Sequence, residues 1–210
     1  MASDLYFEAF LQRVQARLDP IDGMEVPAAE NGLTHAAVML LLRPAAGAGS
    51  DDAAAGDAAE ILFIKRAERA GDPWSGHLAF PGGRAEKGDA TLLDVAMRET
   101  AEEVGIDARQ GGRLLGRLPA FRPMSARIPS VTVTPFVAAA PRGAIPRLQQ
   151  SEVEAAFWMP VAELMRTGRS AVVRWEGKDG PRELPGFPSP RGTIWGITER
   201  ILSQFLALAE

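Results

Sequence analysis

The stretch "RETAEEVG", residues 98–105, places an arginine and three glutamates on what should be one helix. Glu99, Glu102 and Glu103 are spaced i, i+3, i+4, so a helix would put them on one side of its axis. Like charges at this spacing cost roughly a few tenths of a kcal/mol each. A solvated charged face is the commoner reason for such a cluster. Here the cluster borders the apolar stripe of the same helix, which favours a bound cation that neutralises it.

The helix that carries this stretch is predicted from about Ala90 to Val104. Asp89 is placed to cap its start, and Gly105 stands where a C-cap glycine should lie. Mostly apolar residues recur along it at the helical period, which predicts a buried stripe of Leu93, Ala96, Met97, Thr100 and Val104. The segment before it, 71–89, is dense in Gly and Pro and is expected to be mostly loop. Loop and carboxylates can therefore lie close in space.

Composition limits the classes of protein to be considered. The chain has 210 residues, a net charge of −4, no cysteine and 46% hydrophobic residues. This length predicts one domain with a sizeable core. The lack of cysteine excludes disulfides and thiolate metal sites and fits a cytoplasmic location. No apolar run approaches the ~20 residues of a membrane span, and the N-terminus lacks a secretion pattern. The acidic balance argues against a nucleic-acid polymer as partner.

The rest of the chain mixes strand and helix patterns without regular alternation. Strands are expected at 34–44, 59–67, 113–121, 130–140 and 171–175. Within 154–165, a turn at Pro160 should separate a short strand from the start of a helix. Helices are expected over 4–18, with Asp4 as N-cap, and at the end of segment 192–210. This mixture predicts an α+β fold, a layered α/β/α sandwich, rather than a doubly wound sheet.

The sequence divides into an N-terminal helical extension, 1–30, and a main domain, 31–210. The apolar stripe of the extension favours packing on its own domain, and a homodimer contact is the alternative. Residues 44–59 are mostly Ala and Gly with three aspartates, so a flexible loop is expected there.

A hard divalent cation would neutralise the three glutamates. Mg²⁺ and Mn²⁺ prefer carboxylate, carbonyl and water oxygens, and Mg²⁺ is usually held by few carboxylates together with substrate phosphates. Such an ion can clamp a diphosphate, lower the pKa of a bound water and offset charge during displacement. The residues therefore predict metal-assisted hydrolysis of a phosphoanhydride in a small phosphorylated substrate.

The segment "GGRAEKGDATLLDVAMRETAEEVGI", residues 82–106, resembles the signature of the Nudix hydrolases, G-x5-E-x7-R-E-U-x-E-E-x-G-U, where U is bulky and aliphatic. The second half matches from Arg98 onward, except that Thr100 replaces an aliphatic residue. In the first half, Asp89 stands where the pattern has Glu, and the gap to Arg98 is one residue longer. The resemblance implies a Nudix fold with a mixed β-sheet between helices, a Mg²⁺ or Mn²⁺ cofactor and a nucleoside diphosphate derivative as substrate.

The resemblance also implies roles for single residues. Glu99, Glu102 and Glu103 would be metal ligands, together with Gly82 through its carbonyl. Arg98 would hold one of the glutamates in orientation, so that Arg98, Glu102 and Glu103 count as catalytic. The base that activates water is either a signature glutamate or an acid on a later loop, where Glu152 is the candidate, with Glu154 behind it.

Substrate contacts are less sharply defined by the sequence. The candidates are Arg66, Arg69, Arg84 and Phe80, with Arg122 and Arg127 as further arginines able to bind phosphate. His77 could touch a phosphate and Trp195 could stack on a base, although a structural role is at least as common for each.

One branch of the family is indicated by the motif G-x3-F-P-G-G at residues 76–83. Together with the longer loop, "FWMP" at 157–160 and "WGIT" at 195–198, it resembles the coenzyme A pyrophosphatases, which implies cleavage of coenzyme A or its thioesters to 3′,5′-ADP and 4′-phosphopantetheine. An upstream element of that branch, L-L-T-x-R-S-x3-R-x3-G, is only partly present. Arg66 fits its first arginine, Ala67 replaces Ser, and the second arginine is displaced to Arg69.

Two further interpretations stay open. Other substrates would be ADP-ribose, dinucleotides or nucleoside di- and triphosphates. A nucleotide-binding module without turnover is the alternative class, although such a module would be expected to lose metal ligands, whereas all three glutamates are present.

Overall fold

This computed structural model describes residues 2–21, 25–27, 33–45, 58–71, 74–123, 130–177 and 180–210. Most of the loop predicted at 44–59 therefore lies outside the described residues, as does Arg127. Pro44 and Ala59, at the two ends of that predicted loop, belong to strands. No helix in the described part of the chain is long and apolar enough to cross a membrane.

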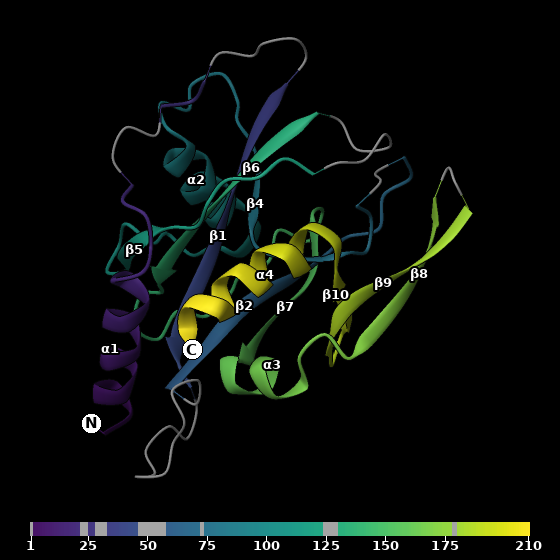
Figure 1. Cartoon of the computed structure of the whole chain (residues 1–210). Helices are drawn as coiled ribbons and strands as arrows, with labels where there is room; N and C mark the ends of the chain where they lie inside the picture. Colours follow the sequence, from purple (N-terminus) through teal and green to yellow (C-terminus); the bar gives the residue numbers. More distant parts are fainter. Residues whose placement is uncertain are drawn as a thin grey trace.

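A seven-stranded mixed sheet forms the middle layer (Figure 1). Its path runs through β3 (Leu78–Ala79), β2 (Ala59–Arg66), β1 (Thr34–Pro44), β6 (Val131–Ala139) and β5 (Arg113–Arg117), while β4 (Gly82–Arg84) pairs with β1 and β7 (Val153–Pro160) pairs with β2. β1 and β6 are parallel, and the other pairs are antiparallel. The strands predicted at 34–44, 59–67 and 130–140 are confirmed, whereas the one predicted at 113–121 ends at Arg117.

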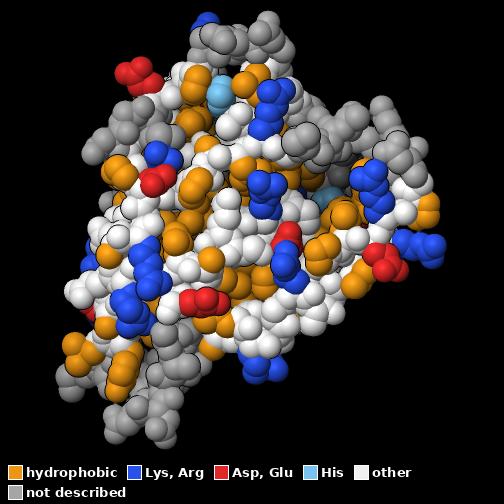
Figure 2. All heavy atoms as spheres, in the orientation of Figure 1, with side chains coloured by type: hydrophobic (Ala, Val, Ile, Leu, Met, Phe, Trp, Pro, Cys, Tyr) orange, Lys and Arg blue, Asp and Glu red, His pale blue; other side chains and the backbone are white. Residues whose placement is uncertain are grey.

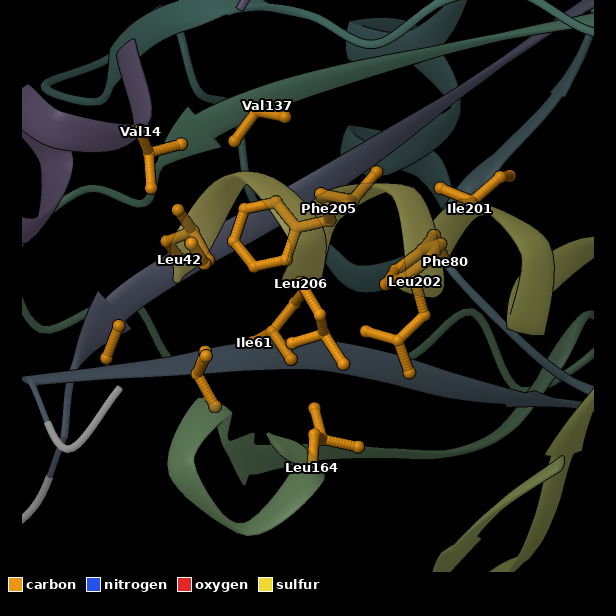
Figure 3. Close-up of a cluster of buried hydrophobic side chains, with 14 of the residues drawn as sticks. Val14, Leu42, Ile61, Phe80, Val137, Leu164, Ile201, Leu202, Phe205 and Leu206 are labelled. Carbon is orange, nitrogen blue, oxygen red and sulfur yellow. The ribbon is translucent and has the colours of Figure 1, made fainter. Parts of the chain in front are cut away.

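Helices cover both faces of this sheet. α2 (Leu92–Val104) packs on one face, where Ala37, Met39 and Leu41 of β1 belong to its core. The other face carries α1 (Ala2–Gln15), α3 (Val161–Thr167) and α4 (Gly196–Ala209), which bury the alternate residues Leu40 and Leu42 (Figure 3). Covering on both faces explains why β1 is continuously apolar. The predicted α/β/α layering is thus confirmed.

A second, three-stranded sheet was not predicted in full. It has the order β10 (Gly192–Trp195), β9 (Gly180–Ser189) and β8 (Ala171–Gly177), and β10 leads directly into α4. The three prolines of β9 are unusual for a central strand, because proline lacks the N–H that a ladder needs. The structure tolerates them because β8 pairs only with residues 180–186 and β10 only with 186–189, so each proline has one neighbouring strand.

The N-terminal helix is shorter and earlier than predicted. It spans Ala2–Gln15 instead of 4–18, so Asp4 lies in its first turn rather than at its cap. Leu5 is 73% exposed, although it is one of the apolar residues of this helix. It precedes Phe7 by two residues, which is about 200° around a helix and points it away from the core. Phe10 and Val14 are fully buried in the core that also contains α4.

Candidate active site

The caps of α2 fix the helix that carries the carboxylates. Thr91, not Asp89, is the N-cap: its hydroxyl accepts from the Asp94 N–H, and Asp94 accepts from the Thr91 N–H in return. Such a reciprocal capping box satisfies two helix-end donors at once. Gly105 ends the helix at φ 66°, as predicted, with its N–H bonded to the Ala101 carbonyl.

Contrary to the prediction, Asp89 does not cap the helix but binds the guanidinium of Arg98. Its carboxylate accepts from Arg98 Nε at 3.1 Å and from Arg98 Nη2 at 3.0 Å, and the Glu86 N–H donates to it at 2.8 Å. The hydrogen bonds from Arg98 lower the pKa of Asp89. Arg98 Nη1 in turn donates to Glu99 Oε1 and Glu102 Oε2, both at 3.0 Å. Arg98 is therefore held by one carboxylate while it holds two others, which bears directly on its predicted orienting role.

The sequence marked the position of Asp89 but not its partner. Asp89 stands six residues after Gly83, where the Nudix pattern has its first glutamate. The shorter side chain and the longer gap to Arg98 still bring the carboxylate to the guanidinium, in a two-point geometry that fixes the arginine plane.

We expect Asp89→Asn to lower kcat/KM by about 10- to 100-fold without unfolding the protein, because an asymmetric amide no longer fixes Arg98 and its two glutamates. Steady-state kinetics and circular dichroism would measure this. Asp107→Asn is a matched control, since among the described residues the Asp107 carboxylate accepts hydrogen bonds only from Arg109 and Gln110, which lie nearby on the surface. A loss of equal size in both variants would contradict a positioning role for Asp89.

Glu103 is the most buried member of the cluster, with 2% of its surface exposed. Its Oε2 accepts from the Gly82 N–H at 2.9 Å, and its Oε1 lies 3.9 Å from Arg66 Nη1. Burial raises the pKa of Glu103 from its ordinary 4.5 to about 7, against the opposing effects of Gly82 and Arg66. A buried carboxylate with this pKa sits where additional positive charge would stabilise its ionised form.

Glu99 lies next to the glycine loop. A Cβ placed on Gly83 would be 2.2 Å from Glu99 Oε1, so glycine is required for this carboxylate to approach the backbone. Burial also raises the pKa of Glu99, and Arg98 opposes this rise. Glu102, by contrast, is exposed and contacts Arg98.

Glu152 joins this cluster from a loop some fifty positions further along the chain. It immediately precedes β7, and its carbonyl accepts from the Ala67 N–H at 2.8 Å. Besides burial, which is the main cause, its negative charge adds to the raised pKa of both Glu99 and Glu103. Glu154 instead pairs with Lys65 at 2.8 Å. Of the two later-loop candidates, the structure brings Glu152 to the cluster.

The predicted substrate residues divide between the site and other regions. Arg66 contacts Glu103, and Arg69 bonds to the Ser151 carbonyl and lies 3.4 Å from Glu152. Arg84 is exposed and lies over the Trp74 ring, with its carbonyl accepting from Arg98. These three arginines line the surroundings of the carboxylates. Arg122 bonds to Ser130 and shares no contact with them among the described residues.

Phe80 is a correction to the predicted substrate contacts. It is 2% exposed and stacks on Phe63 with ring centroids 4.9 Å apart. It lies in the core on the α4 side of the sheet (Figure 3), whereas the glutamates project from α2 on the other side. On the face that carries α4, acidic side chains are scattered rather than clustered (Figure 2). Phe80 alternates with Ala79, which faces α2, so the strand pleat directs its ring into the core.

The donor set fits a hard divalent cation chemically, although its side chains are not arranged around one point. Among the described residues, no group of three or more His, Cys, Asp or Glu converges closely enough to hold a metal. The reason lies in the hydrogen bonds: Arg98 engages Glu99 and Glu102, while Gly82 engages Glu103. All available ligands are carboxylate or carbonyl oxygens, which suit Mg²⁺ and Mn²⁺.

A hollow of about 680 Å³ lies elsewhere, between α1 and the turn that follows β6. Phe7, Leu11, Arg43, Arg142 and Trp158 are among the residues that line it. None of the clustered glutamates does so, and three of its arginines already pair with acids of the chain. We therefore place the site at the carboxylates and not at this hollow.

The raised pKa of Glu103 predicts how the stability of the metal-free protein depends on pH. The pKa of Glu103 in the folded protein exceeds its ordinary value. The contribution of Glu103 to the free energy of unfolding is therefore fully present below pH 4.5 and is lost as pH rises through about 7. The loss of stability is on the order of 3 kcal/mol, because a difference of one in pKa corresponds to 1.36 kcal/mol. Glu103→Gln does not titrate, so urea unfolding in chelator should show its stability rising relative to wild type between pH 5 and 7.5. Parallel pH profiles would contradict this.

Comparison with known proteins places these observations in a family. A family model described as NUDIX domain matches residues 41–176. An uncharacterized protein of Schizosaccharomyces pombe is 40% identical over 108 residues, covering 50% of this chain and 33% of that protein. A Klebsiella pneumoniae protein named as an uncharacterized Nudix hydrolase, NudL, is 40% identical over 135 residues, covering 62% of this chain and 65% of its own. This chain thus spans less than two thirds of the length of these relatives.

A solved structure shares the fold. The NUDIX hydrolase from Alicyclobacillus acidocaldarius aligns with 88% of this chain and 95% of its own, with a TM-score of 0.54 and 19% identity. Its agreement with the mixed sheet and flanking helices supports the predicted fold class.

Proposed function

Because the chain belongs to the NUDIX domain family, we propose that it is a hydrolase that cleaves the phosphoanhydride linkage of a nucleoside diphosphate derivative with the help of Mg²⁺ or Mn²⁺. One observation carries this proposal. The buried Glu103 carboxylate, held by the Gly82 N–H, lies close to Glu99 and Glu152 and beside the guanidinium of Arg66. A cluster of like charges in a partly buried place is costly unless a cation and an anionic substrate complete it.

Each residue has a distinct part in this proposal. Glu99, Glu102 and Glu103 would hold the cation, and Arg98 with Asp89 sets the orientation of the glutamates. When bound, the cation offsets the negative charge of the diphosphate and lowers the pKa of an attacking water. Arg66 binds a phosphate oxygen on the side of Glu103.

Glu152 is the candidate general base. It accepts the proton of the attacking water as the water oxygen bonds to phosphorus and the bridging oxygen departs with the second phosphate. Its position beside Glu99 and Glu103 supports this role, and Arg69 limits where its carboxylate can turn.

Coenzyme A or one of its thioesters is the proposed substrate within this class. The products would be 3′,5′-ADP and 4′-phosphopantetheine. The G-x3-F-P-G-G motif and the longer segment from Gly83 to Arg98 support this choice, and the Asp89–Arg98 pair gives that length a structural reason. The displaced second arginine, Arg69, argues against coenzyme A. The 3′-phosphate of coenzyme A would need a cationic side chain, and Arg69 is already bonded to Ser151 and paired with Glu152.

A hydrolysis screen tests both levels of the proposal. Coenzyme A, an acyl-coenzyme A, 3′-dephospho-coenzyme A, ADP-ribose, a dinucleoside polyphosphate and ATP would be incubated with Mg²⁺ or Mn²⁺, and the products separated by chromatography. Preference for coenzyme A over its dephospho form supports the specific substrate, and the reverse preference overturns it. Failure to turn over any of them would overturn the hydrolase and favour a nucleotide-binding module.

A further inference from the structure

Two aromatic rings lie in contact at the edge of the sheet next to the proposed site. The ring centroids of His77 and Trp195 are 4.6 Å apart, with their planes inclined by 55°. Both residues are half-buried. They come from segments more than a hundred residues apart, which the fold brings together where β3 contacts β10. Neither ring belongs to the two main core clusters.

The register of the strands puts His77 on the carboxylate side of the sheet. The Arg66 N–H donates to the His77 carbonyl at 3.0 Å, which continues the pairing of Lys65 with Leu78. Residues opposite each other on paired strands direct their side chains to the same face. Arg66 reaches toward Glu103 on that face, so the His77 ring begins on the same face, one strand spacing of about 4.8 Å further toward the edge.

Trp195 is held rigidly in this place. It closes β10 opposite Gly186 and immediately precedes α4. The first turn of α4 is fastened to the sheet by the Thr198 hydroxyl, which donates to the Leu78 carbonyl at 2.9 Å. Because the backbone on both sides of Trp195 is fixed, little backbone entropy is lost when a flat ligand packs on the ring.

We propose that the His77–Trp195 pair is the nucleobase subsite of this enzyme, an inference that rests on the proposed diphosphate site. Trp195 supplies the apolar surface on which a base stacks, and His77 supplies a polar edge beside it. The order along the sheet is then carboxylates, Arg66, and the ring pair. This matches the order of a nucleoside diphosphate derivative, whose reacting phosphates come first and whose base lies beyond them. The ligand class for this subsite is an aromatic nucleobase joined through ribose to phosphate.

Binding of a matched pair of probes tests the subsite independently of hydrolysis. Adenosine 5′-monophosphate and ribose 5-phosphate differ only in the base, and calorimetry with Mg²⁺ present measures the affinity of each. Stacking on an aromatic side chain is worth about 1–3 kcal/mol per base, so Trp195→Leu should weaken binding of adenosine monophosphate about 5- to 150-fold and leave binding of ribose phosphate unchanged. Trp195→Phe should keep most of the affinity. Trp175→Leu, which removes a tryptophan of the β8–β9 hairpin, is the control and should bind adenosine monophosphate like wild type.

The possible outcomes separate this subsite from the hydrolase itself. Wild-type protein that binds both probes equally, or Trp195→Leu that binds adenosine monophosphate as tightly as wild type, overturns the subsite while the diphosphatase stands. Trp195-dependent binding without hydrolysis of any diphosphate supports the subsite and overturns the proposed activity. If Trp195→Leu does not fold, His77→Ala replaces it, and an unchanged preference for the base in that variant overturns the pair.

Discussion

Replacing Glu103 by Gln is expected to reduce kcat/KM by about a thousandfold or more while the protein stays folded. Gln keeps the length of the side chain and can still accept from the Gly82 N–H, but it carries no charge. Loss of one anionic ligand to a catalytic cation removes several kcal/mol of transition-state stabilisation, and ~4 kcal/mol corresponds to about a thousandfold in rate. Steady-state kinetics on the best substrate of the screen, with Mg²⁺ in excess, would measure the loss.

A second readout separates a ligand from a merely structural carboxylate. Calorimetric titration with Mn²⁺ should show weaker binding to Glu103→Gln than to wild type. Glu154→Gln is the matched control, because Glu154 is exposed and pairs with Lys65 away from the cluster. We expect that control to keep activity within about twofold, as for other surface changes. Turnover of Glu103→Gln at the wild-type level would show that the metal assignment is wrong.

Features set by local sequence were the ones that could be predicted. The period of apolar residues located α2 and β1 because a helix with one buried face and a strand buried on both faces leave different patterns. The glutamate spacing predicted a carboxylate cluster beside the apolar stripe, and Glu103 is indeed buried. The C-cap at Gly105 was also readable, because a helix end favours glycine at positive φ.

Features set by long-range pairing could not be read in the same way. The strand β9 was missed because its prolines are tolerated only through the staggered overlap of its two neighbours. Asp89 was placed as a helix cap because Thr91 and Asp89 are both good cap residues, and only the fold shows that Asp89 meets Arg98. The core position of Phe80 follows from the pleat of β3, two residues long and too short to recognise as a strand.

The second large effect concerns folding, and it comes from Gly82→Ala. Gly82 has φ 152°, and a Cβ there would lie 2.3 Å from the Ala37 carbonyl oxygen and 2.6 Å from the Val38 Cα. Both atoms belong to the backbone of the central strand β1, which cannot move aside. Strained φ and overpacking each cost about 1–3 kcal/mol, so we expect ~4 kcal/mol of lost stability and a Tm lower by about 10 °C. Thermal unfolding followed by circular dichroism would measure this.

Two other glycines separate the causes of this effect. Gly88 also has a positive φ, 121°, but a Cβ there would meet no atom within 4 Å, so Gly88→Ala should show the conformational cost alone. Gly83→Ala would meet Glu99 Oε1 at 2.2 Å, which is the end of a side chain that can swing away. That variant should therefore stay folded and lose activity, because Glu99 leaves the cluster. Equal Tm values for the Gly82 and Gly88 variants would mean that β1 yields, and that lack of space beside β1 does not require glycine at position 82.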